Sequence, residues 1–317
     1  MVNVYKCAFG AALALGLCVS AYATDANTEL TIAADGAAKT LGQNFSLAAD
    51  GIVEVSNVRG SVTIRGGDAD GIKLAGSLGE GSKLIVEGSH RHIELRVESD
   101  RAGGWFGSKG PANDTDLVLD VPRGAQVKLD LVSANGKVGG IEGKSIEIDS
   151  VSGEVRVDAA APRVEVESVS GDVVLQVARA GATVSAHLQT VSGNIKANGA
   201  DGRVKLGTVS GTITFAAPTV TELGAESVSG NIEASASPAK GARVRAETMS
   251  GNVRLHLGAD LAARIHAETF SGSLKSDYGK VVKAEYGPGS SVDVDGGGSD
   301  TRIEAQAFSG NVELRKQ

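Results

Sequence analysis

Two carboxylates that follow a recurrent Ser-Gly dipeptide are the first candidates for chemistry in this sequence. Glu154 and Asp172 occupy the same place in two successive copies of a short phrase, so they would lie on neighbouring turns of a repeat. A pair of carboxylates is what glycoside cleavage needs, one as general acid and one as base or nucleophile. Further copies carry mostly Asn, Thr or Ser at this place, which favours a solvated polar face. A polysaccharide-active lyase or hydrolase is the alternative function that this pair leaves open.

Histidines offer two further candidate sites, both of them weak. His90 and His92 alternate onto one face of a predicted strand, a spacing that can hold a metal ion. No carboxylate or cysteine nearby in the sequence completes a ligand set. His256 and His266 fall in one repeat unit, on different sides of the coil that it would form. We therefore predict no metal centre at the histidines.

A glycine-rich segment near the C-terminus partly matches a calcium-binding loop. Asp293, Asp295 and Glu304 take its first, third and twelfth places, and Gly298 takes the sixth. The fifth place has no oxygen-bearing side chain, and no helices flank the segment. A plain turn is the better interpretation, so these three acids stay weak metal candidates and no cofactor is expected.

The aromatic pair Trp105-Phe106 is the strongest local candidate for binding. It holds the only Trp of the chain and lies in a Gly-rich stretch, 100–114, that we predict to be an exposed loop. Exposed aromatic rings stack on sugars or anchor a protein partner. The alternative is that both rings fold back and plug an open end of a repeat structure.

The elements that must position these residues are short repeats. An apolar residue, Ser and Gly, a small or acidic residue and then Val, Ile or Leu recur at Val151, Val169, Val191, Val209, Val228, Met249, Phe270 and Phe308. Successive glycines of the phrase are 18, 22, 18, 19, 21, 21 and 38 residues apart. We interpret the last interval as two periods, with a degenerate copy near Ser291-Val292. A period close to 20 residues is typical of a solenoid.

Alternation within each unit predicts strands. Val151, Gly153, Val155 and Val157 would share the inner face of an extended strand, while Ser152, Glu154 and Arg156 face outward. A second strand precedes each phrase, as at Val164–Val166, and the change of spacing after it places a corner at Glu167-Ser168. Such units bury their inner face only by stacking about 4.8 Å apart. The chain is therefore predicted to be all-β, a parallel β-helix with about 20 residues per coil, wound right-handed.

The two small residue types of the phrase have structural interpretations. Glycine lets the backbone bend or come close to other atoms where a side chain would clash. Ser and the following Asn or Asp fit turns and can form hydrogen bonds with equivalent residues of neighbouring coils. Most recurrent residues thus have a structural role, and none of them forms a catalytic set.

Four segments are predicted along the chain. Residues 1–23 form a signal peptide, with Lys6, an apolar run over 7–19 and a small-x-small cleavage site before Thr24. Residues 24–44 are poorly defined, 45–124 form an irregular β cap that includes the 100–114 loop, and 125–317 form the regular repeats. The apolar run is too short to span a bilayer. We expect an exported protein, periplasmic or secreted to the cell surface, with no membrane span after cleavage.

Composition narrows the class of partner. The formal net charge is −7, and no concentrated basic stretch occurs, which disfavours nucleic acid. An envelope or cell-surface protein or a glycan is the expected partner. Self-association through the open ends of the solenoid is a further possibility, because unpaired strand edges promote association.

The order of these motifs carries a family resemblance. Val53–Ile64, then a Leu-x-Leu-x-Val-Pro-x-Gly stretch at Leu117–Gly124, then tandem Ser-Gly-[Asp/Asn]-[Val/Ile] units resemble the bacterial putative-adhesin family of envelope β-strand repeat proteins, whose domain has no established function. The resemblance covers roughly residues 45–317. It implies a non-enzymatic adhesin or envelope scaffold and brings no catalytic residues that could be transferred to this chain.

Overall fold

The computed structural model describes residues 28–99, 113–177 and 183–317, and within them it contains strands and no α-helix. No segment of this part of the chain forms a helix of the length and hydrophobicity that crossing a bilayer would need. The all-β prediction is therefore confirmed. The strands are β1 (Thr28–Ala33), β2 (Lys39–Phe45), β3 (Ile52–Leu78), β4 (Ser82–Ser89), β5 (His92–Ser99), β6 (Thr115–Pro122), β7 (Gln126–Gly139), β8 (Ser145–Ser152), β9 (Val155–Ala159), β10 (Arg163–Ser170), β11 (Val173–Val177), β12 (Ser185–Ser192), β13 (Ile195–Asn198), β14 (Arg203–Ser210), β15 (Ile213–Ser229), β16 (Ile232–Ser250), β17 (Val253–Leu257), β18 (Arg264–Ser271), β19 (Leu274–Ser276), β20 (Val282–Lys283), β21 (Ser290–Val294), β22 (Arg302–Ser309) and β23 (Val312–Lys316).

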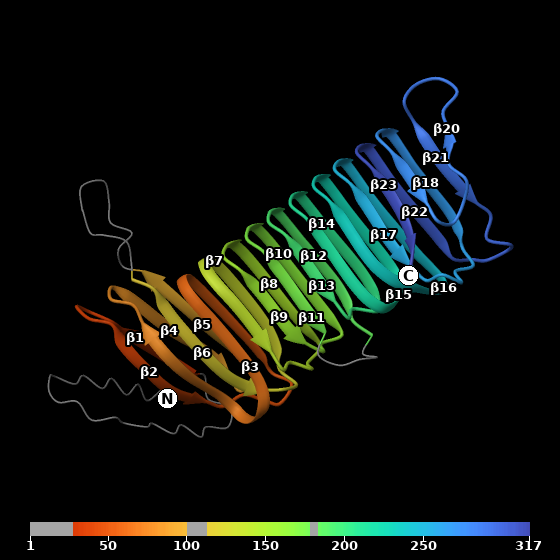
Figure 1. Ribbon diagram of the computed structural model, residues 1–317. Helices are drawn as coiled ribbons and strands as arrows, with labels where there is room; N and C mark the ends of the chain where they lie inside the picture. Colours follow the sequence, from red (N-terminus) through yellow and green to blue (C-terminus); the bar gives the residue numbers. More distant parts are fainter. Residues whose placement is uncertain (1–27, 100–112, 178–182) are drawn as a thin grey trace, which may run out of the picture.

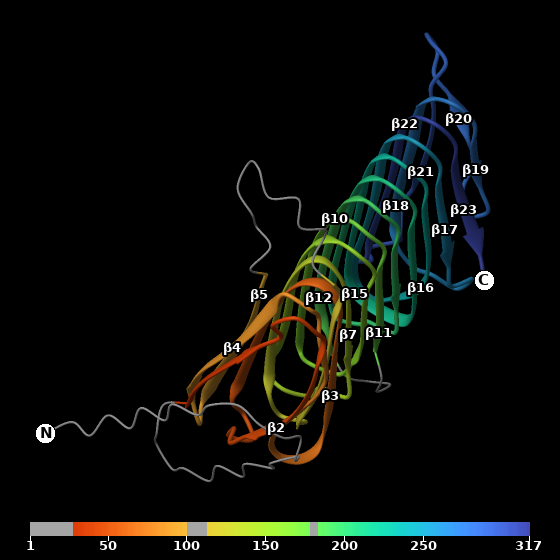
Figure 2. The same ribbon diagram turned by 90° about the vertical axis from the view of Figure 1, so that its left-hand side faces the viewer.

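The strands stack into two layers that face each other across a narrow core (Figures 1 and 2). The first layer runs in the order β1, β4, β5, β3, β7, β8, β10, β12, β14, β15, β16, β22, β18, β21 and β20. The second layer runs β2, the end of β3, β6, the middle of β3, β7, β9, β11, β13, β15, β16, β17, β23 and β19. From β7 to β17 each coil contributes one strand, or one half of a long strand, to each layer.

Equivalent residues of successive coils lie directly beside each other in the central part. Ser152, Ser170 and Ser192 pair in parallel register, and the series continues to Ser250. Inward positions carry small aliphatic side chains, such as Val164 and Val166 in β10 and Val173 and Leu175 in β11, all of them at most 1% exposed. Aliphatic residues of this size fill the space between two closely spaced layers, which explains why so few aromatic residues are needed.

The corner of each coil lies later in the sequence than predicted. We expected it at Glu167-Ser168, but β10 continues without a break to Ser170, and the bend follows at Gly171-Asp172. The strand keeps its alternation up to that bend, so Ser168 points inward and Val169 points outward. The prediction that Val151 shares the inner face with Val155 and Val157 is wrong for the same reason.

The glycine of the repeated phrase permits a close approach between coils. A Cβ atom on Gly171 would overlap the carbonyl oxygen of Gly153, and one on Gly193 would overlap that of Gly171. All eight glycines of the phrase meet a backbone carbonyl of the adjacent coil in this way. The prediction that these glycines allow a close approach is confirmed, and the atoms that come close are backbone atoms of the adjacent coil.

At the N-terminal end, the first coil in the sequence is not the outermost coil of the stack. Residues 52–56 of β3 pair with β5 on one side and with β7 on the other, and residues 60–65 lie between β6 and β7. The coil made by β3 is thus enclosed by coils that follow it in the sequence. The antiparallel strands β1, β2 and β4 complete this end of the molecule (Figure 1).

The C-terminal end repeats the same arrangement. β22 lies between β16 and β18, and β23 lies between β17 and β19. The predicted degenerate copy near Ser291-Val292 is wrong, because these residues belong to β21, which pairs antiparallel with β18. The long interval before Phe308 therefore holds a hairpin, β20–β21, and a return to a place inside the stack.

Candidate binding groove on the first layer

A ladder of exposed apolar side chains runs along the outer face of the first layer, beside the corners. Its residues, in spatial order, are Val58, Val132, Val151, Val169, Val191, Val209, Val228, Met249, Phe308 and Phe270. Their exposed fractions lie between 37% and 62%. With about 4.8 Å between coils, the ladder is on the order of 43 Å long. Large exposed apolar patches are uncommon on monomeric proteins, which makes this stripe the candidate binding surface.

The ladder is widest at its C-terminal end. Phe308 of β22 and Phe270 of β18 stack with their ring centroids 4.9 Å apart and their planes 5° from parallel. This contact exists only because β22 inserts beside β18, since the two residues are far apart in the sequence. Large aromatic and thioether side chains, Met249 among them, provide most contact area at this end.

Small polar residues lie just inside the ladder, at the edge of the core. Thr190, Thr208, Thr248 and Thr269 are buried and donate their hydroxyl hydrogen bonds to a glycine carbonyl of the adjacent coil, over 2.7 to 3.3 Å. A short β-branched hydroxyl side chain therefore gives a carbonyl at the corner a hydrogen-bond donor. At these four corners the bond accounts for the inward polar residue, while the next residue, which is apolar, points to solvent. Among the described residues, the equivalent hydroxyls of Ser150, Ser168 and Ser227 are buried without a hydrogen-bond partner.

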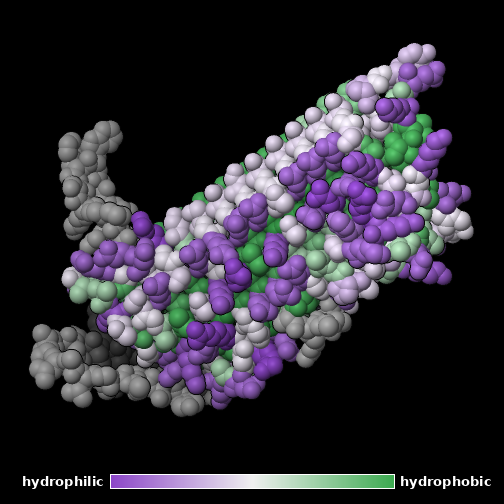
Figure 3. All heavy atoms as spheres, in the orientation of Figure 1, coloured by the Kyte–Doolittle hydropathy of each residue, from purple (hydrophilic) through white to green (hydrophobic). Residues whose placement is uncertain are grey.

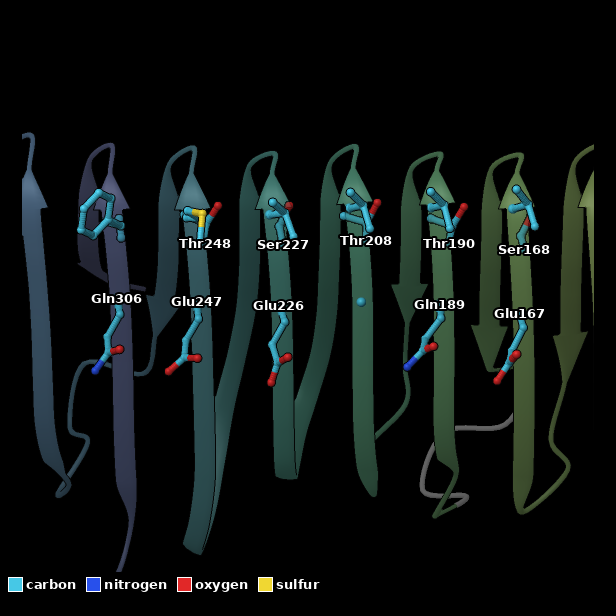
Figure 4. Close-up of a pocket in the computed structure, with 18 of the residues that line it drawn as sticks. Glu167, Ser168, Gln189, Thr190, Thr208, Glu226, Ser227, Glu247, Thr248 and Gln306 are labelled. Atoms are coloured by element: carbon cyan, nitrogen blue, oxygen red, sulfur yellow. The ribbon is translucent and has the colours of Figure 1, made fainter.

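An acidic row runs parallel to the ladder, two residues earlier on the same strands. It consists of Asp130, Asp149, Glu167, Glu226, Glu247 and Glu268, interrupted by Gln189, Gly207 and Gln306. Figure 4 shows Glu167, Gln189, Glu226, Glu247 and Gln306 projecting in the same direction from neighbouring strands. Ladder and acidic row together line one groove of about 1690 Å³.

The acidic row is only partly neutralised by the residues that the structure describes. Arg245 Nε lies 2.6 Å from Glu247, and His266 Nε2 lies 3.6 Å from Glu268. Within the described chain, no cationic side chain lies within 4.0 Å of Asp149, Glu167 or Glu226. Partial burial raises the pKa of Asp149, and the neighbouring carboxylates Asp130, Glu147 and Glu167 raise it further. The groove therefore has a negative potential beside its apolar side.

The hairpin β20–β21 closes the C-terminal end of the groove. Val282, Ala284 and Ser290 line the groove next to Phe270. The hairpin is joined to the solenoid through β21, which pairs with β18, and through His266, whose Nδ1 lies 2.7 Å from Asp293 Oδ1. This hydrogen bond raises the pKa of His266, partial burial opposes the change, and the nearby charges of Asp293 and Glu268 add to it.

We expect the His266–Asp293 contact to make stability depend on pH. A histidine whose pKa is higher in the folded state stabilises that state fully below its unfolded pKa of about 6.5, and this contribution disappears as pH rises through the folded pKa. In denaturant titrations between about pH 5.5 and pH 8.5, the native protein should lose stability with rising pH relative to His266→Gln. Because the ring is 44% exposed, the difference should be small. Parallel curves for the two proteins would contradict this assignment.

The structure places the predicted carboxylate pair, Glu154 and Asp172, in adjacent coils but gives both side chains structural contacts. Glu154, just before β9, forms an ion pair with Arg156 of that strand. Asp172 Oδ1 accepts hydrogen bonds from the backbone N–H and the side-chain amide of Asn194, over 2.8 and 3.1 Å. The same contact recurs along the corner, where Asn231 accepts from the N–H of Asn252 over 3.0 Å. The predicted hydrogen bonds between neighbouring coils are confirmed at this position.

The outer face of the second layer differs from the groove. Its outward positions include Arg156, Lys196, Arg254 and Glu313, and Arg254 Nε lies 2.9 Å from Glu313 Oε2. Figure 3 shows one face of the molecule on which hydrophilic side chains lie between smaller hydrophobic patches, with a pale band of residues of intermediate hydropathy along its upper edge. Among the outward rows of the described coils, the long apolar ladder belongs to the first layer.

The candidate histidine sites are not assembled. His90 lies in the two-residue turn between β4 and β5, with Nδ1 2.9 Å from Ser46 Oγ, while His92 begins β5 with Nε2 3.3 Å from Glu54 Oε2. The prediction that both alternate onto one strand face is wrong, because the turn separates them. His256 in β17 and His266 in β18 lie in different layers, as predicted.

The three weak calcium candidates lie apart. His266 pairs with Asp293 on one side and with Glu304 on the other, so β18 separates these two acids. Asp295 follows β21, before a turn in which the Ser299 N–H donates to the Gly296 carbonyl over 3.1 Å. Within the described residues no group of three metal-ligating side chains converges. Trp105 and Phe106, the predicted aromatic binding pair, lie outside the described residues, as do the predicted signal peptide and its cleavage site.

Sequence reasoning missed the groove because the apolar residue of the phrase was assigned to the core. One signal was available: Ser or Thr precedes that residue in most copies, as in Thr190-Val191 and Thr208-Val209. Continued alternation from Leu188 through Thr190 would have put Val191 outside. The acidic row could then have been found two residues earlier.

The solved structures that align with this chain share few identical residues with it. A putative adhesin from Bacteroides fragilis aligns with 13% identity over 88% of this chain and 99% of its own, with a TM-score of 0.40. A putative cell adhesion protein from Clostridium sporogenes aligns with 12% identity over 93% and 100%, with a TM-score of 0.27. A putative lipid binding protein from Parabacteroides distasonis has 10% identity over 89% and 98%, with a TM-score of 0.26. No curated protein sequence matches the chain.

One protein-family model matches nearly the whole of the described solenoid. The model described as Toastrack DUF4097 matches residues 52–315, from the first residue of β3 into β23. The match includes the repeated Ser-Gly phrases, the interleaved coils at both ends and every residue of the groove. The chain therefore belongs to the Toastrack DUF4097 family.

Proposed function

We propose that this protein is a non-enzymatic binding or scaffold protein of the cell envelope, which contacts a partner through the groove on its first layer. The observation that carries the proposal is the ladder, a row of ten exposed apolar side chains held in line by parallel register. Exposure of so many aligned apolar groups costs solubility, and a partner that covers them explains their presence. Glu154 and Asp172, the carboxylates on which an enzyme would depend, are engaged in structural contacts.

The proposal includes export and an adhesin-like role. The apolar run over 7–19 and the small residues before Thr24 support removal of a signal peptide and a periplasmic, secreted or cell-surface location. Two of the aligned solved structures are named as a putative adhesin and a putative cell adhesion protein, and these names agree with the proposed role. Right-handed winding and a coil of about 20 residues belong to the same proposal. Trp105 and Phe106 remain a proposed second contact, and the partner is an envelope or surface protein or glycan.

Self-association through the ends is a lesser part of the proposal. Among the described strands, β1, β2, β19 and β20 have a pairing partner on one side. β19 and β20 are only three and two residues long, which limits edge-to-edge pairing at the C-terminal end. We therefore give the groove precedence over the ends.

Site-specific photo-cross-linking in the native host tests the groove. A photoreactive residue at position 209, on the ladder, should give adducts, whereas the same residue at position 214, on the second layer, should give none. Adducts at 209 should also disappear when the neighbouring Val191 and Val228 are replaced by Ser. Both side chains point outward from strands of the same molecule, so we expect the two labelled proteins to be expressed and folded alike. Equal cross-linking at 209 and 214, or none at 209, would refute the groove as a binding surface.

A further inference from the structure

The groove combines two kinds of surface in a fixed arrangement, and this arrangement limits what can bind there. The ladder needs apolar groups at a regular spacing, and the acidic row beside it needs positive charge. Outward residues two positions apart on a strand are about 6.6 Å apart, so one rod-shaped segment can cover both rows. The groove is open along its length and closed at one end by Val282 and Ala284 of the β20–β21 hairpin.

We propose that the groove binds an amphipathic α-helix of a partner protein, with its apolar stripe on the ladder and Lys or Arg side chains over the acidic row. This inference rests on the proposed function and names the chemistry of the partner. Rungs of the ladder are about 4.8 Å apart, and successive turns of an α-helix are 5.4 Å apart, so five contacts drift by only about 2.4 Å. Same-side residues of an extended strand are about 6.7 Å apart and would drift by roughly 8 Å.

The carboxylates of the groove determine that the partner must be positively charged where it covers them. Asp149, Glu167 and Glu226 have no cationic side chain within 4.0 Å in the described part of the chain. An approaching Lys or Arg would therefore meet carboxylates that have no competing ion pair. A second copy of this chain is disfavoured as occupant, because its net charge is −7 and it would bring another acidic row to the interface.

The two halves of the groove should contribute differently. The C-terminal rungs, Met249, Phe308 and Phe270, present the largest side chains, and the stacked rings form a flat platform. A few large side chains that become fully covered carry most of the binding energy in an interface. The valine rungs and the unpaired acids fix the direction along the groove and the rotation of the helix.

Calorimetric titration of the full chain with designed 18-residue peptides tests the inference. The probe is an amphipathic Leu/Lys helix, and its matched peptides are a scrambled Leu/Lys sequence and an amphipathic Leu/Gln helix. We expect the amphipathic Leu/Lys peptide to bind and the scrambled one to bind at least tenfold more weakly. Val191→Ser combined with Val209→Ser should weaken binding at least tenfold, and Glu167→Gln combined with Glu226→Gln several-fold. Matched substitutions on the second layer, Val174→Ser and Glu233→Gln, should change nothing.

The possible failures are distinguishable. If the Leu/Gln helix binds as tightly as the Leu/Lys helix and still depends on Val191 and Val209, the basic partner is wrong while the groove remains a binding surface. If the scrambled peptide binds equally well, or if second-layer substitutions weaken binding as much, the helical inference fails. A dimer in light scattering that the Val→Ser variant dissociates would identify a second copy as the occupant. Absence of cross-links from position 209 of the otherwise unchanged protein in the host would refute the proposed function itself.

Discussion

Gly230→Ala should destabilise the protein by about 3 kcal/mol or more, one of the largest effects of a single methyl group in this chain. A Cβ at this position would overlap the carbonyl oxygen of Gly211 in the adjacent coil. The obstacle is backbone, which cannot rotate away, so two coils would have to separate and stretch their parallel hydrogen bonds. Thermal and urea unfolding, followed by circular dichroism, would measure the loss.

Gly224→Ala is the matched control for this substitution. Gly224 lies six residues earlier, within β15, and nothing lies within 4 Å of the position that its Cβ would take. Because Ala restricts the unfolded chain more than Gly, this variant should be neutral or more stable by up to about 1 kcal/mol. Equal destabilisation by the two substitutions would show that the close approach at Gly230 has no special role.

Deletion of residues 302–317 should disrupt a part of the molecule much larger than the segment removed. β22 and β23 lie inside the stack, so their loss leaves β16 and β17 without a neighbour on one side and separates β18 and β19 from the solenoid. Ile303, Val312 and Leu314 are at most 2% exposed, and their burial alone is worth on the order of 6 kcal/mol. Hydrogen exchange should show that peptides from β18 and β19 lose protection, while β8 to β14 keep theirs.

A hairpin deletion provides the comparison. Replacing residues 280–289 by a short Gly-Ser linker removes β20, which pairs with only two residues of β21. Exchange in β18 should then stay slow, because β22 still pairs with it along its length. If deletion of 302–317 left β18 as well protected as the hairpin deletion does, the interleaved position of β22 would be wrong.

The repeat itself was predictable because its residues are constrained by local physics. Gly at the corner, Asn or Asp after it, and alternating Val and Ile before it can each be interpreted from one coil. Gly171 and Asn194 have the roles that such reasoning assigns, namely close approach and hydrogen bonding between coils. These are interactions between equivalent residues, so the spacing of the copies in the sequence already contains them.

The groove was not predictable to the same degree, because hydrophobicity alone does not say which side of a strand is the inner one. Val169 and Val173 have the same side chain, yet one is 51% exposed and the other 1%. What decides between them is Ser168, whose small side chain fits the edge of the core, and the bend at Gly171 that resets the alternation. The position of Phe308 beside Phe270 was also beyond local reasoning, since it depends on a strand order that spacing does not encode.

The interleaved C-terminal coil also has a consequence for how the chain reaches its fold during synthesis. β18 is made before β22, and in the folded protein it reaches β16 only through β22, with which it pairs in parallel. Until residues 302–309 have been made, β18 therefore has no parallel neighbour of the native stack, and its core-facing side chains stay uncovered on that side. The C-terminal end of the solenoid should accordingly assemble only after the last strands are synthesised, and its rate of folding should depend on how late residues 302–316 become available.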